Sequence, residues 1–153
     1  MEKAKRDLKS VSGFIIFLAI LSLISTLLMV FSPSGSYTAD AIMLREGISV
    51  DEAGVYVGTI VAAGIIGFLL QLYVGLKGII VANGGKRSKI VTVVVVLSII
   101  MLVVGCSSSI GDIISGNTNI LGSQIIIQVC ELLNFILYIV FTNKVITLRK
   151  TNV

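Results

Sequence analysis

The sequence contains no histidine and no tryptophan, and it has only one proline among 153 residues. The lack of histidine removes the commonest metal ligand and the side chain that most often carries protons near neutral pH. Two cysteines, Cys106 and Cys130, are too few for a disulfide framework. Gly84-Gly85-Lys86 lacks the spacing of a phosphate-binding loop. We therefore expect no metal, no cofactor and no enzymatic activity.

Charge is also scarce. Only 13% of the residues are charged, whereas a soluble domain has about a quarter. Hydrophobic residues make up 56% of the chain, and the mean hydropathy is +1.05. A water-soluble fold of this length could not bury so much apolar surface, so lipid is the expected solvent. At this length, residues 1–153 are expected to form one domain.

Four apolar segments are long enough to cross a bilayer, which requires about 20 helical residues. The first is too long for the apolar region of a signal peptide, which has about 7–15 residues, so we expect it to be retained. The valine-rich third segment favours a strand in water, but a helix in lipid satisfies its own backbone. The sequence predicts an all-α integral membrane four-helix bundle with helices over 11–31, 53–82, 90–106 (or as far as 114) and 121–147.

The charges between these segments predict their orientation. Basic residues cluster before the first segment, between the second and third, and at the end of the fourth. In the other two connections, Arg45 is the single basic residue. By the positive-inside rule, both termini are predicted to be cytoplasmic. The net charge of +4 lies beside the membrane, which favours anionic lipid headgroups over nucleic acid as the partner. The predicted headgroup contacts are Lys3, Lys5, Arg6 and Lys9.

Short capping and stop motifs mark the helix ends. Ser49 and Glu52 have the spacing of a capping box at the start of the second helix. Gly84 and its neighbours stop that helix, and Ser88 is placed to cap the third. Residues 38–45 are predicted to form a short helix on the outer surface.

Cys106 follows an apolar run and precedes three serines, a pattern similar to a bacterial lipoprotein signal. Such signals begin the chain, whereas this run follows two other apolar segments, so an ordinary third helix is the preferred interpretation. Cys130 is predicted to lie roughly 13 Å inside the fourth helix. Bridged cysteines need Cα atoms within about 7 Å, so we expect two separate thiols.

Small residues follow one side of the second segment. Their spacing of three or four residues keeps many of them on one helix face, where another backbone can approach closely. Packing within the chain is the plainer interpretation, and homodimerisation or a sliding surface are the functional alternatives. The predicted helix-packing glycines are Gly54, Gly58, Gly64, Gly67, Gly75 and Gly78.

Glu131 lies inside the fourth apolar segment, roughly 15 Å from its outer end. A charged carboxylate at that depth costs several kcal/mol unless it has a partner. Each of the other three segments carries a polar side chain at a similar depth, and the fourth adds a second. Lys77 is placed either to extend toward the headgroups or to reach toward Glu131. The predicted polar layer contains Glu131, Gln71, Gln128, Ser98 and Ser22.

Two interpretations of Glu131 remain open. It either holds the helices together through hydrogen bonds, or it binds a proton or cation during transport. Four helices enclosing one acid resemble the small drug/proton antiporters in size and helix count. Those proteins have their acid in the first helix, however, and the first segment here has none.

The segments MEKAKRDLKSVSGFIIFLAILSLIS and GLKGIIVANGGKRSKIV combine a basic start with a glycine-rich second helix that ends in a short basic turn. In these features the whole chain resembles a pool of uncharacterised small four-helix membrane proteins of Gram-positive bacteria. The resemblance implies a protein of the bacterial plasma membrane and carries over no site residues.

Two functional hypotheses follow from the sequence. The first is a non-enzymatic membrane protein that acts by helix association, as a homo-oligomer or as an accessory subunit of a membrane complex. The second is a small proton- or cation-coupled transporter or channel that uses Glu131 at the middle of the membrane.

Overall fold

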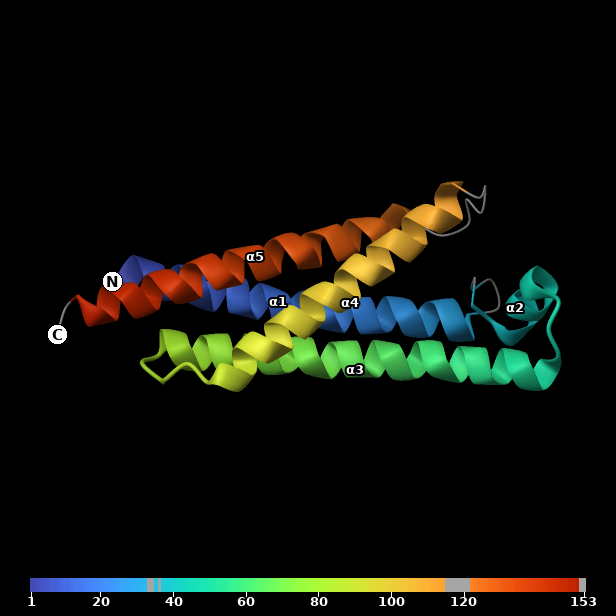
Figure 1. Cartoon of the computed structure of the whole chain (residues 1–153), viewed down its shortest axis with the longest axis horizontal. Coiled ribbons are helices and arrows are strands. Elements are labelled where there is room, and N and C mark those ends of the chain that lie inside the picture. The colour runs from blue at the N-terminus through green and yellow to red at the C-terminus, as the bar shows by residue number, and fades with distance from the viewer. Residues whose placement is uncertain (33–34, 36, 115–121, 152–153) are drawn as a thin grey trace.

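The computed structural model describes residues 1–32, 35, 37–114 and 122–151, and its described part consists of five helices without a strand (Figure 1). They are α1 (Glu2–Phe31), α2 (Ala39–Glu46), α3 (Val50–Ala82), α4 (Lys89–Ile114) and α5 (Gly122–Lys150). All but α2 are long and apolar enough to cross a membrane. The predicted all-helical architecture with four candidate spans is therefore confirmed.

Helix α1 begins at Glu2, nine residues before the predicted start of the first apolar span. The reason is that Ala4 and Leu8, spaced by one helical turn, continue the buried face of the helix into its basic first part. Helix α5 likewise continues three residues beyond the predicted 147. Helix α4 extends to Ile114, the longer of the two predicted ends, and the candidate span within it ends at Ser107.

The predicted capping box at the start of α3 and the predicted Ser88 cap at the start of α4 are confirmed. The Ser49 backbone N–H donates to Glu52 Oε2 at 2.9 Å, and the Glu52 N–H donates back to Ser49 Oγ at 3.4 Å. Helix α2 is capped by Thr38 at its start and ends at Gly47, whose φ of 66° favours glycine. Ser88 Oγ accepts a hydrogen bond from the Ile90 N–H at 3.3 Å at the start of α4.

Helices α1 and α3 lie side by side along most of their length, α5 lies along α1, and α4 crosses diagonally from α3 to α5 (Figure 1). Helix α3 contacts all four of the other helices, as expected for the central helix of the bundle. Both termini lie at the same end of the bundle as the turn between α3 and α4 (Figure 1). We call the half of the bundle at this end the basic half, and the other half the α2 half.

The apolar core lies mainly in the basic half. Leu8 and Ile15 of α1 pack there against Val74 and Val81 of α3. Helices α4 and α5 complete this cluster, because their turns in this half converge on α3. Their contributions are Val91, Val95, Phe135, Tyr138 and Val145.

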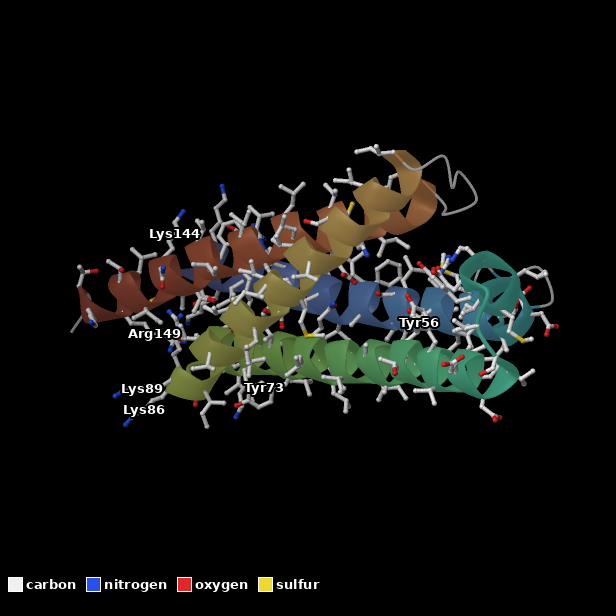
Figure 2. All side chains as sticks on the ribbon, turned by 45° about the vertical axis from the view of Figure 1, so that its right-hand side comes forward. Tyr56, Tyr73, Lys86, Lys89, Lys144 and Arg149 are labelled. Atoms are coloured by element: carbon white, nitrogen blue, oxygen red, sulfur yellow. The ribbon has the colours of Figure 1, made fainter. Side chains whose placement is uncertain are left out.

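Two arginines fasten the end of the basic half. Arg149 of α5 donates hydrogen bonds to the backbone carbonyls of Val81 and Gly85, the latter at 3.0 Å, and so satisfies carbonyls at the end of α3. Arg87 donates to Asn143 Oδ1 at 2.9 Å and to Thr92 Oγ1 at 3.0 Å. Figure 2 shows Arg149 at this end, together with Lys86, Lys89 and Lys144.

Candidate functional site

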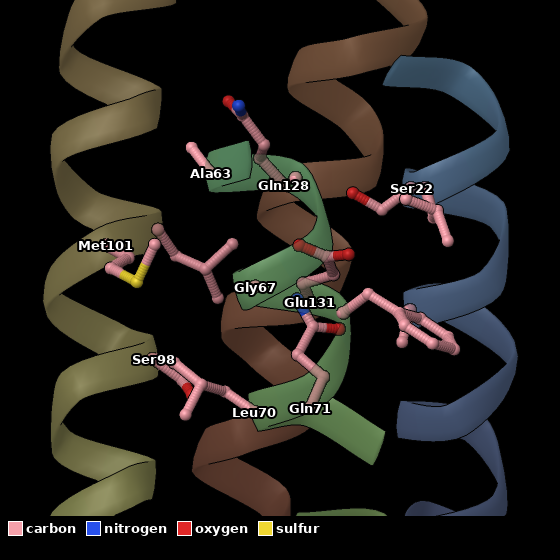
Figure 3. A pocket seen from close by; sticks show the side chains of 14 residues that line it. Ser22, Ala63, Gly67, Leu70, Gln71, Ser98, Met101, Gln128 and Glu131 are labelled. Atoms are coloured by element: carbon pink, nitrogen blue, oxygen red, sulfur yellow. The ribbon is translucent and has the colours of Figure 1, made fainter. Parts of the chain in front are cut away.

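A cavity of about 140 Å³ lies between α1, α3, α4 and α5 at the level of Glu131 (Figure 3). All five residues of the predicted polar layer line it. Apolar and small residues such as Leu70, Met101 and Gly67 complete its wall. The polar residues are Ser22 from α1, Gln71 from α3, Ser98 from α4, and Gln128 and Glu131 from α5.

The helical repeat explains why the four helices meet at this level. Gln128 and Glu131 are three residues apart and therefore lie on one face of α5. Because α1 and α5 run beside α3, Ser22 and Gln71 come to the same depth as that face (Figure 3). Ser98 enters from α4 where that helix crosses toward α5 (Figure 3).

Glu131 is 2% exposed, and Gln71 and Ser98 are also buried. The side chains of Gln71 and Ser22 are the hydrogen-bonding groups that face the Glu131 carboxyl group. Even so, three oxygen atoms at this level have no hydrogen-bond partner within the described part of the chain. They are Glu131 Oε1, Gln71 Oε1 and Ser98 Oγ.

A second group of buried oxygens lies in the basic half, and its chemistry differs. Ser12, Tyr138 and Thr142 each have a hydroxyl oxygen without a partner among the described residues. A hydroxyl can rotate to donate as well as accept, so neighbouring hydroxyls can satisfy one another. A carboxylate oxygen and an amide oxygen only accept. The Ser98 hydroxyl has a single proton to donate, so at least one of the two oxygens Glu131 Oε1 and Gln71 Oε1 requires a donor or a cation from outside this set.

The cavity borders a larger hollow on the side of the α2 half. This hollow has a volume of about 390 Å³ and shares Ala63 and Gly64 with the cavity wall. Tyr37, Tyr56 and Thr26 add polar atoms to its lining. Helix α4 diverges from α3 in this half (Figure 1), which leaves space between the helices. In the basic half, the packed core closes the same region.

Lys77 lies over the ring of Tyr73, with its Nζ 5.5 Å from the ring centroid. Both residues belong to α3, and the contact satisfies the cation by a cation–π interaction. Of the two alternatives left open for Lys77, an approach to Glu131 is therefore not the one observed. Among the described residues that line the cavity, Glu131 is the single one with an ionisable side chain.

The glycines of α3 divide into two groups. A Cβ on Gly75 would lie 2.9 Å from the Ser12 backbone oxygen, and one on Gly78 would collide with Ser12 and Tyr138. A Cβ on Gly64 would lie 3.0 Å from Thr26 Cγ2. Around Gly54, Gly58 and Gly67, by contrast, no described atom lies within 4 Å of such a Cβ.

The other predicted residues take separate positions. Lys5, Arg6 and Lys9 line a hollow at the end of the basic half, and Lys3 lies outside its lining. Cys106 and Cys130 are both free thiols, as expected.

Three residues of structural importance were not among the predicted site residues. Asn134 Nδ2 donates to the Val11 backbone oxygen at 3.3 Å and links α5 to α1. Ser12 meets Gly78 and Tyr138 at a junction of three helices. Arg149 caps α3. Only Asn134 gave a sequence signal, because it continues the polar face of α5.

No protein-family model, no curated protein and no solved structure matches this chain.

Proposed function

We propose that this chain is a multi-pass protein of a bacterial plasma membrane with both termini in the cytoplasm. Four long apolar helices support membrane insertion. The shared position of the termini and the α3–α4 turn supports the orientation, because it gathers all three basic clusters at one end of the bundle. The cytoplasmic side is then the basic half, and the α2 half faces outward.

The function best supported by the geometry is the binding of a proton or a small cation at Glu131, as a step in transport or channel activity. The observation that carries this proposal is the set of unpartnered oxygens of Glu131, Gln71 and Ser98 at one cavity. Carboxylate, amide and hydroxyl oxygens are the ligands of hard cations. A proton on Glu131 would satisfy the same site by turning its carboxyl group into a donor.

Access to Glu131 is proposed to come from the outer side. The cavity shares part of its wall with the hollow in the α2 half, whereas the core blocks the cytoplasmic side. A charged carboxylate in this position costs several kcal/mol without a partner. A bound proton or cation removes that cost, so occupancy of the site and stability of the bundle are coupled.

Reconstitution of the purified chain into vesicles tests this proposal. The vesicles would contain a pH-sensitive dye or, in a parallel set, a fluorescent indicator for Na⁺ or K⁺. The parent protein is expected to carry one of these ions down an imposed gradient, and Glu131→Gln is expected to abolish that flux. Glu46→Gln is the matched control, because it removes an exposed carboxylate at the far end of α2.

Absence of flux from the parent protein, or equal flux from the parent and Glu131→Gln, would reject the transport proposal. The result counts only if Glu131→Gln folds normally and stays folded in detergent. Circular dichroism and size-exclusion chromatography check the folding of each variant.

Association through α3 is the second candidate function. It is favoured by Gly54 and Gly58, which are exposed and have no described atom within 4 Å of the place where a Cβ would lie. Their spacing by four residues forms a surface on which a helix of a second copy or of a partner subunit can pack closely. Val55 and Tyr56, exposed on adjacent faces, add apolar area beside it.

Single-molecule photobleaching or light scattering in detergent tests association directly. We expect an oligomer for the parent, and Gly58→Leu should shift it toward the monomer. Gly13→Leu provides the control, because Gly13 is an equally exposed helical glycine on α1 with no described neighbour. A monomeric parent would count against self-association.

A further inference from the structure

A hollow of about 300 Å³ lies at the end of the basic half, between the first turns of α1 and the last residues of α3. Lys5, Arg6 and Lys9 line it from α1, and Ala82 and Asn83 line it from α3. From this arrangement we propose a binding site for the phosphate group of an anionic lipid. This inference is independent of the proposed role of Glu131.

The charges in the hollow favour an anion. Glu2 is the one carboxylate in its lining, and Lys5 Nζ pairs with it at 2.9 Å. Arg6 and Lys9 have no ion-pair partner among the described residues. A guanidinium group can bind a phosphate with two parallel hydrogen bonds, and an ammonium group adds a second positive charge. Asn83 can add a neutral amide donor.

The end of a helix would ordinarily oppose an anion at this place. The last carbonyls of α3 carry the negative end of its dipole, and they point toward the region of Ala82 and Asn83. Arg149 donates to one of these carbonyls, that of Val81, and to the Gly85 carbonyl in the turn that follows α3. The positive charge of Arg149 thereby offsets part of the negative end of α3, which lessens its repulsion of an anion in the hollow.

A stripe on α1 favours a lipid phosphate over a phosphate ion in solution. Arg6, Gly13 and Phe17 are seven and four residues apart, so they lie on one face of the helix. Gly13 leaves open space on that face. Phe17 is 56% exposed and stacks against Phe14 with a centroid distance of 6.0 Å. A phosphate at Arg6 would therefore place an acyl chain along Gly13 and against Phe17.

Native mass spectrometry of the full chain, titrated with phosphatidylglycerol in a detergent micelle, tests the proposal. The Arg6→Gln/Lys9→Gln double variant is expected to bind this lipid about 25-fold more weakly, from roughly fivefold for each basic residue near an anionic surface. The Lys144→Gln/Lys150→Gln double variant removes the same charge at the same end, away from the hollow, and should keep parental affinity. Lys3→Gln is a second control, on the same helix but outside the hollow.

Two further measurements separate a specific lipid site from a site for free phosphate and from a general effect of charge. Phe17→Ala should weaken lipid binding and leave any stabilisation by inorganic phosphate unchanged. If inorganic phosphate at equal concentration protects the parent from thermal unfolding as well as the lipid does, the site binds free phosphate and the lipid assignment is overturned. Equal loss of lipid in both double variants would show a general charge effect and would also overturn the proposal.

Discussion

The two halves of this bundle use the same central helix in opposite ways. In the basic half, Gly75 and Gly78 of α3 lie against Ser12, and a side chain at either position would collide with α1. In the α2 half, Gly54 and Gly58 of the same helix have no described atom near the place of a Cβ. The glycine face of α3 is thus covered by α1 in the basic half, whereas the face that carries Gly54 and Gly58 is uncovered in the α2 half.

The difference teaches how a polar site can exist inside an apolar bundle. In the basic half, close packing leaves no free space around the buried hydroxyl groups, and these groups can pair with each other. At the edge of that core, divergence of α4 leaves a cavity, where Glu131 Oε1 and Gln71 Oε1 have no partner among the described residues (Figure 3). The site therefore lies at the boundary between the closed half and the open half.

The largest effect is expected from a matched pair of glycine substitutions. Gly78→Ala should destabilise the protein by about 2 kcal/mol, because the added methyl group would collide with Ser12 and Tyr138. Gly58→Ala should be neutral or stabilise by up to about 1 kcal/mol, because alanine favours a helix over glycine. Unfolding by sodium dodecyl sulfate in mixed micelles measures both. Equal destabilisation by the two would break the contrast between the halves.

A smaller effect is expected at the end of the basic half. Arg149→Met should cost about 1–2 kcal/mol, because the Gly85 carbonyl loses the arginine as a hydrogen-bond donor and the Val81 carbonyl keeps backbone donors alone. Faster amide hydrogen exchange should then appear in the last turn of α3 and in the α3–α4 turn. Lys150→Met is the control, since Lys150 is exposed. Unchanged exchange at 79–85 would show that Arg149 does not fasten this end.

The smallest effect concerns the boundary between the halves. Asn134 lies one turn from Glu131 toward the basic end, and its side chain donates to the Val11 backbone oxygen. Asn134→Leu should cost about 0.6 kcal/mol, the average for a hydrogen bond between membrane helices. Leu133→Met, on the exposed side of α5, is the control for the same unfolding measurement. A loss of stability as large as that expected for Gly78→Ala would show that the tightly packed basic half reaches as far as the cavity.

Much of the fold could be predicted from the sequence because its signals are local. The capping box at Ser49 and the glycine stop at Gly84 act within a few residues of themselves. The start of α1 could not be placed, since the basic residues before 11 resemble a loop until Leu8 is seen to be buried. The depth of each residue along its helix was enough to place Glu131 beside Gln71, because four antiparallel helices of similar length cross the same thickness of membrane.

The sequence by itself determined that this protein has four long apolar helices, where most of them begin and end, and which polar residues share one depth. These features depend on composition, on the helical repeat and on the length needed to cross a bilayer. Only the tertiary structure decided which glycines of α3 are covered, and that Arg149 closes the end of that helix. It also decided that the oxygens around Glu131 face a cavity. The physical reason is that contacts between helices depend on crossing angles, and the divergence of α4 is a property of the whole bundle that no short segment encodes.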